Sequence, residues 1–301
     1  MTKIKQWWEE EVQLGFEGLW SGWQLKSYTV DDVVRMADQY ALTGCTYAHI
    51  PFIQLLEGAG TDLDGFHFSS KTEPNNNQDL LKVAVEEFHK RNIKIVSYFN
   101  GHSFTQEFYR RHPEWVMIKE NGEPLLTVYG TGASACPNNP EYREWQAAVM
   151  RDMLKYDIDG IFMDGDIFFL ESCYCHVCKR LFKEKYNKPM PLKSDRSNPD
   201  WRFLREFQID SLTEYVGHMY KTIKSERAST MLYCNNCTRS PNWPTGRYNR
   251  KLIQVTDMIL SEEGGWLYSN FNASPVWRIE CGNKWCNTQA GGKPVAGAAC
   301  L

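Results

Sequence analysis

Short apolar runs alternate with amphipathic stretches along this chain, which is the pattern of a parallel β-sheet covered by helices. The predicted strands are residues 16–21, 46–51, 93–100, 160–164, 230–235, 257–261 and 293–299. The predicted helices are residues 31–40, 79–91, 140–155, 178–186, 202–224 and 274–285. Thr29 is expected to cap the first helix and Gly44 to end it.

Seven strand candidates in serial order favour a (β/α)8 TIM barrel over an open doubly wound sheet. The chain also lacks a Gly-x-Gly-x-x-Gly motif after an early strand, which argues against a dinucleotide-binding fold. A closed barrel needs an eighth strand, and the chain ends at Leu301, just after the seventh. We therefore expect residues 1–301 to form one α/β barrel domain that is incomplete and truncated.

The composition excludes several classes of partner. The net charge is −3, so electrostatics favours neither nucleic acid nor a membrane surface. No apolar run is long enough to span a bilayer, and the charged N-terminus lacks a secretory apolar region. Without a signal peptide, a disulfide framework is not expected from the ten cysteines, and we expect a cytoplasmic protein. Aromatic residues make up 14% of the chain, which suits a carbohydrate-binding cleft, although core packing would account for most of them.

Three thiols lie close together in Cys173-Tyr-Cys-His-Val-Cys178. Thiolates bind Zn²⁺ tetrahedrally, and four of them make a closed, structural site. The fourth ligand could be Cys136 or His176. Cys136 is favoured because the helix after it leads back to the fourth strand, so the helix begins near the carboxyl end of that strand. The alternative is a group of reduced cysteines that are simply buried.

Carboxylates follow two of the predicted strands, where parallel α/β folds carry their chemistry. Asp164 ends the fourth strand and Asp166 lies two residues further on, while Glu262 and Glu263 end the sixth. Two carboxylates facing each other across a barrel mouth suit glycoside hydrolysis, with one as nucleophile or base and the other as acid. Each also has a simpler interpretation, as a turn residue or a helix cap. Strand alternation allows only one of Glu262 and Glu263 to face the mouth, and the pattern does not choose between them.

Other polar and aromatic residues at strand ends are candidates for binding sugar hydroxyls and ring faces. A lone histidine among them is as readily a packing residue. The candidate substrate-binding residues are His49, Asn100, His102, Asp166, Asn235 and Trp266, with Asn236, Trp20 and Trp23 as further candidates.

Two stretches of the chain resemble known glycosidase families. Ala135-Cys-Pro-Asn-Asn-Pro-Glu-Tyr-Arg143, followed by Cys173-Tyr-Cys-x-x-Cys178, resembles the zinc motif of family 42 β-galactosidases. That resemblance implies that Cys136, Cys173, Cys175 and Cys178 hold a structural zinc. Family 42 carries an Asn-Glu pair at the end of strand four, whereas this chain has Met163-Asp164-Gly165-Asp166.

Asp159-Gly-Ile-Phe-Met-Asp-Gly165 is more similar to the strand-four segment of α-L-fucosidases of families 29 and 151. The resemblance implies that Asp164 is the nucleophile. Residues 92–98, 112–116 and 121–124 are similar to family 151 and its hypothetical glycosyl hydrolase 6 relatives, which continue into a trimerisation domain. A homo-oligomer is therefore one expectation.

The sequence thus predicts the catalytic barrel of a zinc-containing, retaining, α-L-fucosidase-like glycosidase that acts on a carbohydrate. Asp164 would attack the anomeric carbon, and Glu262 or Glu263 would act as acid and base. A β-galactosidase-like hydrolase and a non-catalytic carbohydrate-binding barrel are the alternatives.

Overall fold

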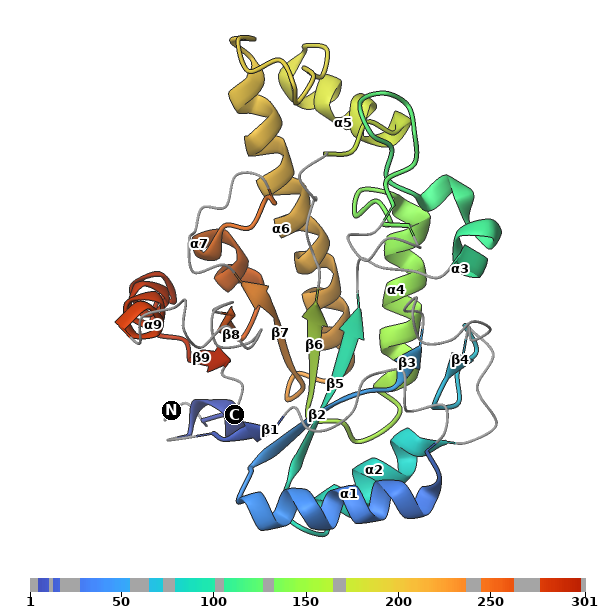
Figure 1. Cartoon of the computed structure of the whole chain (residues 1–301), viewed down its shortest axis with the longest axis vertical. Coiled ribbons are helices and arrows are strands. Elements are labelled where there is room, and N and C mark those ends of the chain that lie inside the picture. Colours follow the sequence, from blue (N-terminus) through green and yellow to red (C-terminus); the bar gives the residue numbers. More distant parts are fainter. Residues whose placement is uncertain are drawn as a thin grey trace.

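A parallel sheet of seven strands forms the centre of the computed structural model (Figure 1). The structure describes residues 5–10, 13–16, 28–54, 65–72, 79–100, 106–126, 133–164, 172–236, 245–262 and 277–298. In order across the sheet, the strands are β1 (Gly15–Phe16), β2 (Tyr47–Pro51), β5 (Lys94–Asn100), β6 (Gly160–Asp164), β7 (Met231–Asn236), β8 (Met258–Glu262) and β9 (Val295–Ala298). All seven predicted strands are present, although the first is observed only as far as Phe16 because residues 17–27 lie outside the described ranges.

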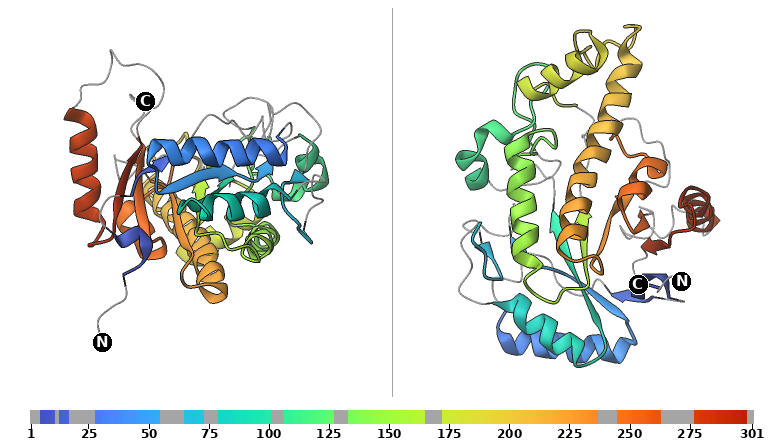
Figure 2. Two further views of the ribbon diagram at one scale, coloured as in Figure 1. Left: turned by 90° about the horizontal axis from the view of Figure 1, so that it is seen from below. Right: turned by 180° about the vertical axis from the view of Figure 1, so that it is seen from behind.

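The strands are adjacent in chain order, which is the order of consecutive strands in a TIM barrel. The sheet curls, so that β9 stands at a steep angle to β2 (Figure 2). Within the described residues, β1 and β9 are the two edge strands. The observed architecture is therefore a curled half-barrel of parallel strands. A short antiparallel pair, β3 (Ile53–Gln54) and β4 (Gly65–Phe66), was not predicted.

Helices connect the strands and cover the outside of the sheet (Figures 1 and 2). They are α1 (Val30–Thr43), α2 (Leu80–His89), α3 (Gln106–Arg111), α4 (Pro140–Met153), α5 (His176–Tyr186), α6 (Trp201–Glu226), α7 (Asn249–Leu252) and α9 (Trp277–Gln289), with the 3₁₀ turns η1 (Trp7–Glu9), η3 (Pro113–Trp115) and η4 (Ile253–Val255). The predicted ends of α1 are confirmed: Thr29 accepts a hydrogen bond from the Asp32 amide, and Gly44 follows at a φ of 73°. The turns α3 and α7 were not predicted. None of the described helices is long and apolar enough to cross a membrane.

The two faces of the sheet bury different residues. On β6, Ile161 and Met163 pack into the large core beneath the covering helices. Phe162 points to the opposite, inner face, where it packs with Val96 and Tyr233. This alternation follows from the two-residue period of a strand, so positions 160, 162 and 164 belong to the inner face.

Aspartates tie the strands together at their amino ends. Asp159 precedes β6, and its carboxylate accepts hydrogen bonds from the Ile95 amide at 2.9 Å and from His89 at 2.7 Å and lies 2.9 Å from Lys94 Nζ. Asp257 precedes β8 in the same way: it accepts from the Leu232 amide at 2.7 Å and lies 2.8 Å from Lys224 Nζ. Each carboxylate therefore satisfies a backbone amide of a neighbouring strand and a lysine.

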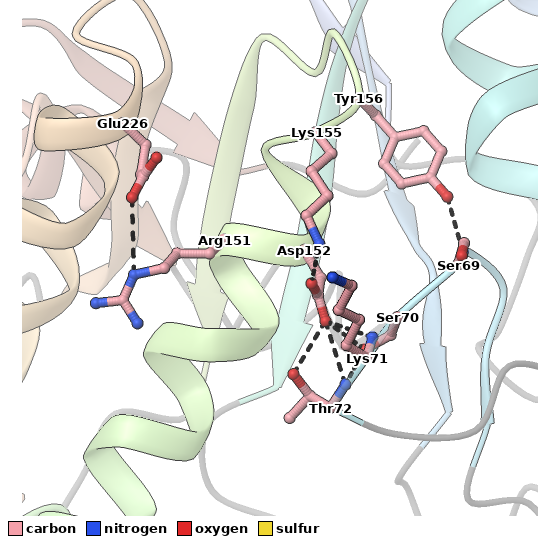
Figure 3. Close-up of polar contacts among 9 residues, drawn as sticks. All are labelled: Ser69, Ser70, Lys71, Thr72, Arg151, Asp152, Lys155, Tyr156 and Glu226. Carbon is pink, nitrogen blue, oxygen red and sulfur yellow. Dashed lines mark hydrogen bonds and ion pairs between the residues drawn. The ribbon is translucent and has the colours of Figure 1, made fainter.

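A third aspartate, Asp152 near the end of α4, holds the segment that follows β4 (Figure 3). Its Oδ2 accepts hydrogen bonds from the Ser70 hydroxyl, the Lys71 amide and both the amide and hydroxyl of Thr72. Its Oδ1 pairs with Lys155 at 2.5 Å. Burial alone would raise the pKa of Asp152, but the ion pair and these hydrogen bonds outweigh it and lower the pKa to about 2.

Candidate active site and thiol cluster

Asp164 lies at the carboxyl end of β6 and is partly exposed. The Tyr98 hydroxyl donates a hydrogen bond to its Oδ2 at 2.5 Å, and the Asn235 side chain donates from Nδ2 to its Oδ1 at 3.0 Å. Both carboxylate oxygens are thus held by neutral donors from the flanking strands β5 and β7. The Asp164 carboxylate is therefore held in a fixed orientation at the carboxyl edge of the sheet, where parallel α/β folds carry their chemistry.

The strand register explains why these three side chains meet. Tyr98 pairs with Phe162 across β5 and β6, which places Tyr98 two residues below the level of Asp164 on the same face. Met163 pairs with Cys234, so Asn235 is the next residue along β7 and stands beside Asp164. Aligned residues of parallel strands share a face, and the side chains therefore converge on the inner side.

His49 lies on the same inner face but among aromatic rings. Its side chain is buried, and its ring centroid lies 5.5 Å from that of Tyr98 and 4.7 Å from that of Phe162. Tyr233 adds a third ring at 6.4 Å. The structure therefore places this predicted substrate-binding residue within the aromatic layer that contacts Tyr98.

The remaining predicted residues of the mouth are located only in part. Asn100 ends β5 opposite Asp164 in the register, and Glu262 ends β8 two residues after Leu260, which pairs with Asn235. For Asn100 and Glu262, the structure describes the backbone only. His102, Asp166, Glu263 and Trp266 lie outside the described residues, as do Trp20 and Trp23.

Sequence reasoning missed two residues of this site. Tyr98 lies two residues before Asn100, which was selected as a strand-end residue, so the two-residue period of a strand could have placed Tyr98 on the same face. Arg247 follows β7 in the loop before α7, and its Nη1 donates to Asn235 Oδ1 at 3.2 Å. No periodic pattern in the sequence indicates that contact.

The four predicted metal-binding cysteines come together at the start of α5, of which Cys175 is the N-cap. Figure 1 shows that α5 lies beyond the carboxyl end of β6. The sulfur atoms of Cys136, Cys173, Cys175 and Cys178 all lie within 4.8 Å of one another. Cys136 Sγ is 3.5 Å from Cys178 Sγ and 3.7 Å from Cys175 Sγ. Tetrahedral thiolates bound at about 2.3 Å from Zn²⁺ would stand about 3.8 Å apart, so the cluster has the dimensions of a tetrahedral metal site.

The electrostatics of the thiols also fit a cation. The Cys173 thiol, followed by Cys175, raises the pKa of Cys136 well above that of an ordinary cysteine. Hydrogen bonds from Cys136 and then Cys173 lower the pKa of Cys175. The cluster thus favours the thiolate form of Cys175 and the protonated form of Cys136, and a bound metal ion would let both carry negative charge. His176, the alternative ligand, is exposed, in agreement with the choice of Cys136.

Polar groups around the cluster suit a negatively charged thiolate centre. Asn138 donates from Nδ2 to Cys178 Sγ at 3.4 Å and to Ser211 Oγ at 2.9 Å. The Cys178 amide, in the first turn of α5, points to Cys175 Sγ at 3.5 Å. Arg143 donates to Asn138 Oδ1 at 3.1 Å, which brings a positive charge close to the thiols. Such second-layer contacts orient ligands and offset their charge.

The loop that carries the thiols is anchored on both sides. Ser172 accepts a hydrogen bond from Gln208 of α6 at 2.9 Å, and the Tyr174 amide donates to the Ile118 carbonyl at 2.7 Å. Cys136 lies before α4, so a bound ion would join the start of α4 to the start of α5. The cluster can hold a metal ion, and no coordination position is left over once four thiolates bind.

Comparison with known proteins points to glycosyl hydrolases. Residues 60–165 match the family model described as Hypothetical glycosyl hydrolase 6. The chain is 26% identical over 161 residues to Glycosyl hydrolase YngK of Bacillus subtilis (strain 168), covering 50% of this chain and 28% of YngK. It is 24% identical over 178 residues to Glycosyl hydrolase DigH of Escherichia coli O6:H1, covering 52% of this chain and 36% of DigH. The chain therefore spans about a third of the length of these relatives.

Solved structures with a similar fold are TIM-barrel glycosidases. The glycoside hydrolase domain of PgaB (BpsB) from Bordetella bronchiseptica superposes with a TM-score of 0.69 at 12% identity, covering 87% of this chain and 76% of that domain. An α-L-fucosidase isoenzyme from Paenibacillus thiaminolyticus gives 0.60 at 14% identity, covering 95% of this chain and 45% of that one. A β-galactosidase from Halorubrum lacusprofundi gives 0.62 at 15% identity, covering 87% and 42%. These likenesses establish the fold, and the sequence relatives support a glycosidase.

Proposed function

We propose that this chain carries the active site of a retaining glycoside hydrolase in which Asp164 is the nucleophile. The observation that carries the proposal is the position of Asp164, which ends β6 on the inner face of the sheet. Tyr98 and Asn235 orient its carboxylate through both oxygens. A nucleophilic carboxylate needs such a fixed orientation toward the anomeric carbon. The similarity to glycosyl hydrolases supports the same reaction class.

We assign the acid/base role to Glu262 rather than Glu263 on the strand register. Asp164, Asn235 and Leu260 stand level on three adjacent strands, and position 262 has the same parity as Leu260. A residue adjacent to position 262 in an extended strand would face the opposite side. Two strand spacings separate β6 from β8 by about 10 Å. Converging Asp and Glu side chains can reduce that distance to the roughly 5 Å that a retaining pair requires.

The proposed substrate is an α-L-fucoside. The Asp-Gly segment around Asp164 resembles the strand-four segment of α-L-fucosidases, and one such enzyme shares the fold. A β-galactosidase-like hydrolase is the second candidate, because the cysteine spacing resembles that of family 42 and a β-galactosidase shares the fold as well. A homo-oligomeric state and a cytoplasmic location stay predictions.

We propose that the metal held by Cys136, Cys173, Cys175 and Cys178 is zinc in a structural role. Four thiolates at tetrahedral spacing are typical of closed zinc sites. When bound, the ion would cross-link the segment that precedes α4 to the segment at the start of α5. It would take no part in the reaction, because a closed site offers no position to a substrate.

A panel of nitrophenyl glycosides tests the proposal. We expect the wild type to hydrolyse the α-L-fucoside with retention of anomeric configuration, as followed by NMR of the first product. Hydrolysis of the β-D-galactoside alone would favour the second candidate. Binding of sugars without turnover of any member of the panel would make the chain a carbohydrate-binding barrel.

Azide rescue identifies the nucleophile. Replacing Asp164 by Gly removes the carboxylate and leaves space for a small anion, so we expect azide to restore turnover and to give a glycosyl azide with inverted configuration. The matched control is Asp157→Gly, at a carboxylate whose side chain is 82% exposed. Turnover by Asp164→Gly without azide at the wild-type rate would reject the assignment.

A further inference from the structure

Arg247 lies next to the site and contacts Asn235, which donates a hydrogen bond to Asp164. Its Nη1 lies 3.2 Å from Asn235 Oδ1 and 3.4 Å from the backbone carbonyl oxygens of Asn235 and Asn236. Its Nε lies 3.4 Å from the Thr245 hydroxyl. These partners are all neutral oxygen atoms, from the end of β7 and from Thr245, two residues before Arg247.

The contact with Asn235 determines which way that amide faces. A guanidinium can only donate hydrogen bonds, and a carboxylate can only accept them. With Arg247 on one side and Asp164 on the other, Asn235 must direct Oδ1 to Arg247 and Nδ2 to Asp164. Reversing the amide would place an N–H against a guanidinium and an oxygen against a carboxylate.

The loop that carries Arg247 is held firmly against the barrel. Gly246 adopts a φ of 81°, and a Cβ at this position would lie 3.0 Å from the Gln208 carbonyl oxygen of α6. Asn249, two residues beyond Arg247, is buried, and its Oδ1 lies 3.5 Å from Asn236 Nδ2. Close packing on both sides of Arg247 gives the guanidinium a defined position.

We propose that Arg247 is a positioning residue for the reaction. It fixes the Asn235 amide so that Asn235 donates to Asp164, and Asn235 in turn orients the carboxylate for attack on the anomeric carbon. The effect on turnover rests on the proposed function, whereas the effect on the Asn235 amide does not. The competing role for Arg247 is a direct hydrogen bond to the substrate.

A double-mutant cycle separates these two roles. We expect Arg247→Met to lower kcat by roughly tenfold to a hundredfold, the range of one hydrogen bond to a charged group, with KM changed less than about threefold. Asn235→Ala should lower kcat to a similar degree. The double variant should match Asn235→Ala alone, because Arg247 acts only through that amide. Losses that multiply, or a KM that rises while kcat is unchanged, would overturn the proposal.

Two further variants control for folding. Arg247→Lys keeps one charged donor, so its kcat should lie between those of the wild type and Arg247→Met. Arg250→Met removes an exposed arginine three residues away and should leave kcat and thermal unfolding unchanged. If Arg247→Lys folds like the wild type yet loses as much kcat as Arg247→Met with a raised KM, direct substrate contact is the better explanation.

Crystal structures of the variants test the proposal without reference to activity. In Arg247→Met, the Asn235 amide should turn or withdraw and lose its hydrogen bond to Asp164, whereas in Arg250→Met that hydrogen bond should persist. An Asn235 amide that stays in place in Arg247→Met would overturn the proposal. If the wild type hydrolyses no glycoside, the proposed function fails, while the position of the Asn235 amide in these crystals still shows whether Arg247 orients it.

Discussion

Two aspartates bracket strand β6, and their surroundings differ. Asp159, at the amino end, accepts hydrogen bonds from His89 and the Ile95 amide and pairs with Lys94. Burial alone would raise the pKa of Asp159, but these contacts outweigh it and lower the pKa. Asp164, at the carboxyl end, is partly exposed and is held by the neutral donors of Tyr98 and Asn235.

The amino-end arrangement recurs at β8. Asp257 also binds a backbone amide of the preceding strand and a lysine, so both carboxylates fasten neighbouring elements together. Asp164 instead receives side-chain donors that set its orientation at the mouth. The comparison teaches that the same residue type fastens neighbouring elements together at the amino end of the strand, whereas at the carboxyl end it is partly exposed and held by side chains of the flanking strands.

The sharpest test replaces each aspartate by asparagine. We expect Asp164→Asn to lower kcat more than roughly a thousandfold and to leave the free energy of unfolding unchanged or slightly higher, because a functional carboxylate contributes little to stability. Asp159→Asn should cost about 2 kcal/mol of unfolding free energy, since it removes the charged acceptor of the hydrogen bonds from the Ile95 amide and His89, and should keep near-normal kcat below its unfolding temperature. Chemical denaturation and initial rates measure the two effects. The comparison would be contradicted if Asp164→Asn lost stability but kept its kcat, while Asp159→Asn lost kcat but kept its stability.

Variants of Glu262, which ends β8, and of Glu263, the next residue in the sequence, test whether the strand register identifies the proposed acid/base. Glu262→Ala should lower kcat/KM by roughly a hundredfold to ten-thousandfold on a phenyl glycoside, whose poor leaving group needs protonation. The loss should be smaller on a nitrophenyl glycoside, whose leaving group needs little acid assistance. Glu263→Ala, at the opposite parity, is the matched control and should change both rates little. Equal losses for both variants would contradict the register argument.

Variants of the thiol cluster test whether the cysteines beyond the carboxyl end of β6 contribute to stability and not to catalysis. We expect Cys175→Ser to lose bound metal and roughly 3 kcal/mol or more of unfolding free energy, because metal binding contributes directly to folding. At a temperature where the variant is folded, kcat should stay near that of the wild type. Mass spectrometry of the metal content and thermal unfolding measure the effects, and Cys281→Ser, at an exposed cysteine, is the control. Unchanged metal content in Cys175→Ser would reject the site.

Much of this architecture was predictable because each strand and helix has its own local sequence pattern. The short apolar runs at residues 93–100 and 160–164 located β5 and β6, and Thr29 and Gly44 marked both ends of α1 through local hydrogen bonding. The spacing of the thiols predicted a cluster that the fold brings within 4.8 Å. Local chemistry of this kind does not depend on the rest of the chain.

The contacts that complete the site were not predictable in the same way. Tyr98 resembles any core aromatic of a buried strand, and its role arises only when β5 and β6 pair in register. Arg247 meets Asn235 through the path of a loop, and loop paths follow from packing such as that of Gly246 on α6. The strands β3 and β4 are two residues each, too short for any periodic signal.

Asp152 gives the smallest expected effect and extends the comparison to pH. Its lowered pKa, about 2, means that the folded state holds the carboxylate more strongly ionised than the unfolded chain does. The resulting stabilisation, about 2 kcal/mol, is fully present above the unfolded pKa of about 4 and is lost as the pH falls through the folded pKa.

Urea unfolding at pH 6 and at pH 3 should therefore show a smaller loss of unfolding free energy on acidification in Asp152→Asn than in the wild type. Asp157→Asn, at a side chain that is 82% exposed, should lose as much stability on acidification as the wild type. An Asp152→Asn variant with the same pH dependence as the wild type would show that the contacts in Figure 3 contribute nothing to acid sensitivity.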